Sequence, residues 1–138
     1  YMGITPETTR ADMARAMLEG VAFSIRQGLE QVGKPVKSLS VIGGGGRVTA
    51  WCAMLADILG QTVAVYRHAD TLPARAIAAA ALIGQGKLRQ YEDFTQALAA
   101  EGEAVRYCPN AEHTRLYDRS YARYLRLYPL LQQWYKTP

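Results

Sequence analysis

Four consecutive glycines occupy positions 43–46, between a short apolar run and an amphipathic segment. Each glycine in regular structure costs roughly 0.5–1 kcal/mol relative to alanine, because more backbone freedom is lost on folding. Four in a row therefore indicate a place where something must approach the backbone closely. The run 38–43 predicts a buried strand, and residues 48–60 predict a helix that ends at Gly60. The glycines would then form the turn from a strand into a helix.

Such a strand–turn–helix connection can bind a nucleotide or another anion. Backbone N–H groups point outward at the start of a helix, the helix dipole favours negative charge, and glycines leave room for a ligand on the main chain. Gly43, Gly44, Gly45 and Gly46 would line this site, and Arg47 stands beside them as a phosphate contact. A tight turn that binds nothing is the alternative.

Two common nucleotide motifs do not fit these glycines. No GxxxxGK[ST] sequence is present, so the turn is not a P-loop. The dinucleotide fingerprint GxGxxG lacks its third glycine, since the frame from Gly43 ends at Val48 and the frame from Gly44 ends at Thr49. Asp70 follows a second predicted strand at a tolerable distance, so a dinucleotide site, although weakened by the missing glycine, remains an alternative. The glycine turn of actin-like ATPase folds, which contacts the adenosine end of ATP, is a third interpretation.

The order of predicted helices and strands is typical of a layered α/β domain. The 138 residues have the size of one domain. A first helix starts within 5–12, where Thr9 and Asp12 fit a capping box, and it ends at Gly33. The other predicted elements are a strand at 62–67, helices at 72–86, 91–100 and 111–128, and an irregular segment or short strand at 104–109.

The residue patterns also predict how these helices pack. Apolar residues cover most of the circumference of the first helix, so we expect it to be largely buried, with Arg15 and Glu19 paired at i,i+4 on the remaining side. The alanine-rich helix at 72–86 has Pro73 in its first turn and can pack very close to a sheet. The last helix should end at Tyr128, because Pro129 follows. Its tyrosines recur at helical spacing and should pack on the domain, with the neighbouring arginines in water.

Composition argues against several classes of protein and partner. The net charge is +4 and 49% of the residues are apolar, which argues for a folded core. No apolar run reaches the ~18 residues that span a bilayer, and no signal peptide is visible, so we expect no membrane partner. The basic, tyrosine-rich last helix also resembles a nucleic-acid surface, but a solvated arginine face is favoured and no nucleic-acid partner is expected. Cys52 and Cys108 lack metal-ligand spacing and indicate reduced, buried thiols of a cytoplasmic protein. The isolated His68 and His113 indicate no metal or catalytic role.

Two longer motifs stand out in the first two thirds of the chain. The first runs from Gly3 to Gly20 and ends in Leu-Glu-Gly, and the second joins the glycine turn and Arg47 to Trp51 and the sequence Met-Leu-Ala-Asp at 54–57. Together they resemble the C-terminal half of carbohydrate kinases of the FGGY family, most closely the xylulokinase branch. The two motifs stand in the family's order and spacing. The resemblance covers roughly residues 1–86 and the remaining tail more loosely.

This resemblance implies an actin-like (ribonuclease H-like) ATPase domain, of which residues 1–138 would be the incomplete C-terminal, nucleotide-side half. The family transfers the γ-phosphoryl of ATP, with Mg²⁺, to a primary hydroxyl of a ketopentose or a related sugar or polyol. The glycine turn, Arg47 and Thr49 would contact the adenosine and nearby phosphate. The general base and the N-terminal sugar-binding domain would lie upstream of Tyr1, so the chain alone should not turn over. A homodimer is a further expectation.

Some residues depart from the family or have a plainer role. The family usually begins the helix at 72–86 with Ala-Leu-Gly-Ala-Ala, whereas this chain has Arg75 and Ala76 in place of the leucine and the glycine. Asp57 is expected to be a structural hydrogen-bonding residue, and Trp51 is expected to pack in the core. A dinucleotide-binding or non-catalytic interaction domain is the alternative function.

Overall fold

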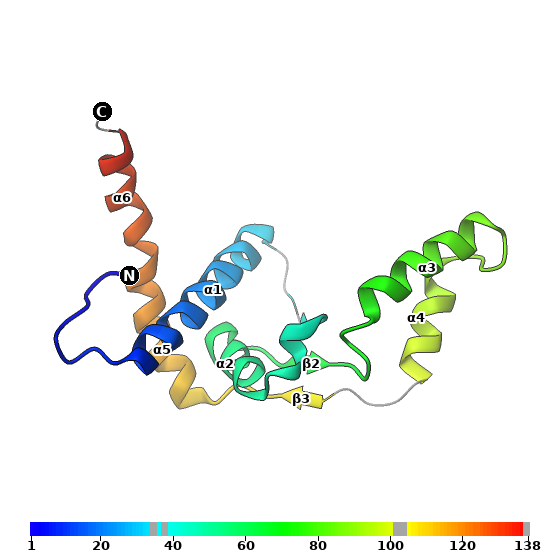
Figure 1. Cartoon of the computed structure of the whole chain (residues 1–138), viewed down its shortest axis with the longest axis horizontal. Helices are drawn as coiled ribbons and strands as arrows, with labels where there is room; N and C mark the ends of the chain where they lie inside the picture. The colour runs from blue at the N-terminus through cyan, green and yellow to red at the C-terminus, as the bar shows by residue number, and fades with distance from the viewer. Residues whose placement is uncertain (34–35, 37–38, 101–104, 137–138) are drawn as a thin grey trace.

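The computed structural model describes residues 1–33, 36, 39–100 and 105–136 of the chain (Figure 1). The elements follow in the order α1 (Arg10–Val32), β1 (Leu39–Ser40), the 3₁₀ turn η1 (Gly44–Arg47), α2 (Thr49–Leu59), β2 (Val63–Val65), α3 (Leu72–Gly84), α4 (Tyr91–Ala100), β3 (Val105–Tyr107), α5 (Ala111–Leu125) and α6 (Leu127–Lys136). The strands form a sheet in the order β1-β2-β3, with β1 parallel and β3 antiparallel to β2. Val63 pairs with Leu39 on one side and with Tyr107 on the other. The predicted α/β class is confirmed.

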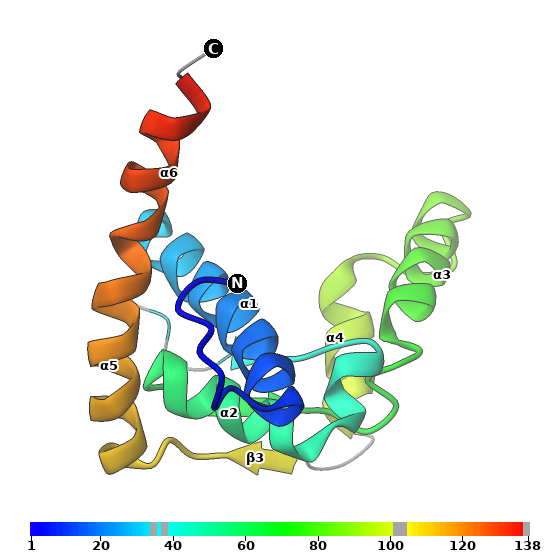
Figure 2. The same ribbon diagram turned by 60° about the vertical axis from the view of Figure 1, so that its left-hand side comes forward.

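The core lies where α1, α2 and α5 pack together (Figure 2), and α2 also contacts β2. Its buried residues are Ala22, Phe23, Leu55, Ala56, Ile58, Val63, Tyr117 and Tyr121. The ring of Phe23 lies 5.5–6.2 Å from the rings of Tyr117, Tyr121 and Tyr124, centre to centre. The predicted packing of the tyrosine seam is therefore confirmed for these three residues. Tyr128 departs from it, since it lies on α6 and is 68% exposed.

Helix α1 has the predicted ends but not the predicted burial. The Thr9 side chain accepts from the Asp12 amide, Asp12 accepts from the Thr9 amide, and Gly33 closes the helix in the left-handed conformation. The helix continues without a break through its internal glycines. However, Ala22 and Phe23 are its buried residues, and most of its other apolar side chains are exposed. The expectation of a largely buried helix was wrong for this chain.

Helices α3 and α4 form a hairpin set apart from the core (Figure 1). Pro73 lies in the first turn of α3, as predicted. Ala79 is the buried residue of this helix, while Ile77 is 73% exposed. The prediction that the alanine-rich helix packs against the sheet was wrong here, because α3 contacts α4 instead.

The C-terminal helix differs from the prediction at Pro129. Helix α5 ends at Leu125, and α6 begins at Leu127 and continues past the proline. A proline is tolerated there because the first amides of a helix have no intrahelical acceptor. Tyr128 therefore does not end the helical structure, because α6 begins at Leu127, before the proline.

Two smaller expectations also need correction. The predicted buried strand at 38–43 is a two-residue strand in the described part of this segment, and its neighbour Ile42 is exposed. Cys52 is buried as expected, but Cys108 is exposed, and both thiols are free. In the described part of the chain, no helix has the length and apolarity needed to cross a membrane.

Candidate functional site

The four glycines form the turn that connects β1 to α2. Gly43 has φ 78° and ψ −166°, a conformation that essentially only glycine adopts, and its amide donates to the carbonyl of Ala69 at 2.8 Å. The 3₁₀ turn η1 follows, closed by the Gly46 amide on the Gly43 carbonyl at 3.2 Å. Helix α2 then starts at Thr49. The predicted strand–turn–helix connection is confirmed.

The glycines serve different purposes in this turn. A Cβ at Gly46 would lie 2.9 Å from Cγ1 of Val65, so this position is filled by the protein itself. A Cβ at Gly45 would meet the Trp51 indole at an ordinary 3.5 Å. At Gly43 and Gly44 it would meet nothing within 4 Å. Space for a ligand against the backbone therefore exists at the first two glycines.

The start of α2 adds unpaired amides to this space. Val48 occupies the N-cap position, and no side chain caps the helix. Thr49 and Ala50 in its first turn are exposed. Because the first amides of a helix lack intrahelical acceptors and carry the positive end of its dipole, this end favours an anion.

The thiol of Cys52 lies against two backbone carbonyls of the glycine turn. The Sγ atom lies 3.7 Å from the carbonyl of Gly45 and 3.9 Å from that of Gly46. Burial raises the pKa of the Cys52 thiol, which keeps the proton on sulfur. The protonated thiol can then donate weakly to these carbonyls.

Arg47, predicted to contact phosphate, forms an ion pair with Asp70, which lies just before α3. The hydrogen bond from Arg47 lowers the pKa of Asp70, so the carboxylate is charged at neutral pH. The Arg47 side chain is 73% exposed, so a phosphate can reach it from solvent. An anion at the turn would compete with Asp70 for this guanidinium.

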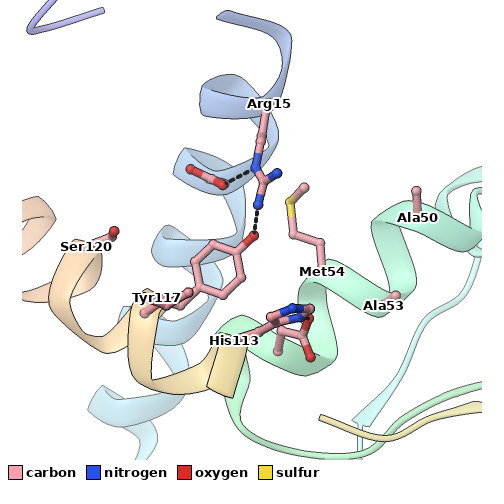
Figure 3. A pocket seen from close by; sticks show the side chains of 10 residues that line it. Arg15, Ala50, Ala53, Met54, His113, Tyr117 and Ser120 are labelled. Atoms are coloured by element: carbon pink, nitrogen blue, oxygen red, sulfur yellow. Dashed lines mark hydrogen bonds and ion pairs between the residues drawn. The ribbon is translucent and has the colours of Figure 1, made fainter. Parts of the chain in front are cut away.

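A hollow of about 370 Å³ lies between α1, α2 and α5, away from the glycine turn, and sequence reasoning did not predict it (Figure 3). Arg15 crosses it, bonded to Glu19 at 2.7 Å and to the hydroxyl of Tyr117 at 2.9 Å. On the opposite wall, His113 contacts Asp57 at 2.9 Å. The predicted i,i+4 pair of Arg15 and Glu19 is thus confirmed and contributes a few tenths of a kcal/mol, roughly.

Asp57 has the structural role that the sequence indicated. One of its carboxylate oxygens accepts from the Asn110 amide at 2.8 Å, and the other contacts the His113 ring. The side chain is 15% exposed. These contacts join α2 to the start of α5, with one partner at each carboxylate oxygen. Trp51 packs against the core, also as expected.

Proteins of known structure contain a segment with the same fold. The chain superposes on the xylulose kinase of Rhodospirillum rubrum with a TM-score of 0.71 at 26% identity, covering 96% of this chain and 27% of that one. It superposes on the xylulose kinase of Lactobacillus acidophilus with a TM-score of 0.72 at 19% identity, covering 95% and 26%. The fold is therefore that of the sugar kinases with an actin-like ATPase architecture.

Sequence comparison then gives the family. The sequence model of the FGGY family of carbohydrate kinases, C-terminal domain, matches residues 1–84, and the chain belongs to this family. The xylulose kinase of Escherichia coli K12 is 31% identical over 134 residues, and that of Staphylococcus epidermidis is 29% identical over 136. The matches cover 95% and 96% of this chain but 27% of each relative. The chain thus spans about a quarter of the length of the curated relatives it matches.

Proposed function

We propose that this chain is the nucleotide-side part of an ATP-dependent sugar kinase. The whole kinase would transfer the γ-phosphoryl of ATP to a primary hydroxyl of a ketopentose or a related sugar or polyol. Membership of the FGGY family supports this class of reaction, and relatives named xylulose kinase support the sugar. A relative named L-fuculokinase, 31% identical over 111 residues, indicates that the sugar varies among similar proteins.

The exposed glycine turn at the start of α2 is the observation that carries the proposal. Gly43 and Gly44 leave open space for the adenosine or the nearest phosphate, and the uncapped α2 amides around Thr49 face the same end of the helix. Arg47 would exchange Asp70 for a phosphate oxygen. A Cβ at Gly45 or Gly46 would meet protein atoms rather than open space, so these two glycines would serve the packing of the turn and not the ligand.

The described residues fit ATP better than they fit a magnesium site. In residues 1–33, 36, 39–100 and 105–136, no three His, Cys, Asp or Glu side chains lie together in a way that could hold a metal ion. Near the turn, Asp70 is paired with Arg47. We therefore assign no step through Mg²⁺ to these residues, and we place the general base in the part of the kinase outside this segment.

The alternative of a dinucleotide-binding site is weakened further, because its candidate carboxylate is already paired. A dinucleotide site needs a carboxylate that accepts from a ribose hydroxyl. Asp70 was the candidate, and its carboxylate is bound to Arg47. The third glycine of the fingerprint is also missing, since position 48 is valine.

The test is a calorimetric titration in which ATP or NAD, with Mg²⁺, is added to the protein. It uses the chain itself and a chimera in which the chain replaces the matched segment of the Escherichia coli xylulose kinase. Gly44→Val puts a side chain into the open space, and we expect at least about a tenfold loss of ATP affinity from blocked approach. Gly84→Val is the matched control, because its Cβ also meets nothing within 4 Å but lies at the end of α3. ATP binding absent from both proteins, or unchanged in Gly44→Val, would refute the site.

A further inference from the structure

The hollow between α1, α2 and α5 has its origin in the sequence of α2 (Figure 3). Four residues at helical spacing share the face of α2 that lines it: Ala50, Ala53, Met54 and Asp57. Because the two alanines have short side chains, about 370 Å³ stays open, within the range of about 300–1,000 Å³ for small-molecule sites. Both alanines are exposed, so packing within the described chain does not require them to be small.

The α1 wall of the hollow carries a paired cation with further hydrogen-bond donors. Arg15 Nε donates to Glu19 Oε1 at 2.7 Å, and Nη2 donates to the Tyr117 hydroxyl at 2.9 Å. These bonds use two of the five N–H groups of a guanidinium. The bond to Glu19 raises the pKa of Arg15 above its ordinary value, so the charge is permanent. Because the Arg15 side chain is 63% exposed, a ligand can reach its other N–H groups.

A second charged pair lies on the opposite wall (Figure 3). His113 Nδ1 lies 2.9 Å from Asp57 Oδ2, while Asp57 Oδ1 accepts from the Asn110 amide at 2.8 Å. A carboxylate can only accept, so we assign the proton of the neutral ring to Nδ1, which leaves Nε2 as an acceptor. The His113 side chain is 57% exposed. The hollow therefore offers donors on one wall and an acceptor on the other.

The charges of these two pairs decide which class of ligand fits. Arg15 and His113 each have a carboxylate partner, so an anion would have to displace one of these carboxylates to form a full ion pair. A neutral polyhydroxylated molecule needs no such exchange, because each of its hydroxyls can donate to one atom and accept from another. Met54 and Leu116 supply apolar surface for the C–H groups of the same molecule.

We infer that this hollow binds a neutral monosaccharide or sugar alcohol at a second site, separate from the nucleotide site proposed at the glycine turn. The inference goes beyond the proposed function, because none of the groups it uses takes part in ATP binding or phosphoryl transfer. The hydrogen bond between Arg15 and Tyr117, which are 102 positions apart, holds α1 and α5 together as two walls of the site.

The test titrates xylitol, D-xylose and D-glucose into the isotope-labelled chain and follows the amide chemical shifts by NMR. We expect at least one of these sugars to shift the amides around the hollow on α1, α2 and α5. Ala53→Phe fills the hollow and should weaken this binding at least about tenfold, because the ring occupies the place of the ligand. Ala122→Phe is the matched control, since Ala122 is an exposed alanine of α5 that does not line the hollow.

Two further measurements distinguish a neutral sugar from a charged ligand. Arg15→Lys keeps the positive charge but loses the planar fork of donors, so the affinity for the sugar should fall at least about fivefold. The affinity of the unaltered chain should be the same in about 0.05 M and 0.5 M NaCl, because salt does not screen a neutral ligand. Inorganic phosphate and adenosine are then added as competitors, and neither should displace the sugar.

Each contrary result would overturn the inference. These results are no shift at the hollow with any of the three sugars, equal binding by the two phenylalanine variants, and unchanged binding by Arg15→Lys. Displacement by phosphate would show an anion site instead, and displacement by adenosine would show an extension of the nucleotide site. ATP titrated into Ala53→Phe tests the proposed function alone, because this variant leaves the glycine turn intact.

Discussion

Replacing Gly46 by alanine separates packing from ligand binding in the glycine turn. The added Cβ would lie 2.9 Å from Cγ1 of Val65, against about 3.5–4.0 Å for an unstrained carbon contact. Valine is stiff about χ1, so β2 or the turn must shift by several tenths of an ångström. Val65 is half-buried, which lets part of the strain relax. Overpacking typically costs about 1–3 kcal/mol, and we expect about 2 kcal/mol here, or a melting temperature lower by roughly 6–10 °C.

A double-mutant cycle with Val65→Ala tests this reasoning. The remaining neighbours of the new Cβ are the Val41 carbonyl at 3.6 Å and the Ala69 Cβ at 3.8 Å, which are ordinary contacts. In the Val65→Ala background, Gly46→Ala should therefore be neutral or stabilising by up to about 1 kcal/mol, because alanine lowers the entropy of the unfolded chain. The coupling between the two sites should reach about 2 kcal/mol.

Urea denaturation followed by tryptophan fluorescence and circular dichroism measures the four free energies of unfolding. Gly44→Ala is the control within the same turn, since its Cβ meets nothing within 4 Å. An equal cost of Gly46→Ala in both backgrounds would show that Val65 does not require the glycine. The contact argument for position 46 would then fail.

Three further outcomes follow from the same geometry. Gly43→Ala should lower the free energy of unfolding by about 1–3 kcal/mol in urea, although its Cβ has free space, because its backbone conformation suits glycine alone. Asp57→Ala should cost about 1–2 kcal/mol in the same assay by leaving the first amide before α5 unpaired, and Asp57→Asn should lose less because it keeps an acceptor. Burial, helped by a hydrogen bond to a carboxylate, raises the pKa of Tyr121 to about 12 from a model-compound value of 10.0. Because the folded-state pKa is the higher one, this stabilisation is complete below pH 10 and is lost as the pH rises toward 12. Denaturation across that range should show the decline, and Tyr121→Phe should flatten it.

Local chemistry explains which parts of the fold could be predicted from the sequence. The capping box of Thr9 and Asp12, the left-handed Gly33 and Gly60, and the pair of Arg15 with Glu19 all involve residues at most four positions apart. Their geometry follows from the helix itself and hardly depends on the rest of the chain. The same holds for the glycine turn as a connection, though not for what it binds.

Contacts between residues far apart in the sequence could not be predicted from local patterns. Arg47 and Asp70 are 23 positions apart and Asp57 and Asn110 are 53 apart, so no periodic pattern links them. The motif placed Arg47 beside the turn, but only the fold shows that a carboxylate already neutralises it. The assignment of the turn to adenosine remains a proposal for the same reason, because a ligand contact is also long-range.

The wrong prediction for α1 is the most informative of these differences. Its apolar pattern predicted burial on most sides, and the chain buries Ala22 and Phe23 while Leu18, Val21 and Ile25 remain 37–50% exposed. A hydrophobic pattern records all the surfaces that a helix buries in its complete assembly, including those formed by other polypeptide segments. Exposed α3 residues such as Ile77, on a helix predicted to meet a sheet, point the same way. The relatives that this chain matches are about four times as long, so a pattern shared with them can record contacts that these 138 residues do not make.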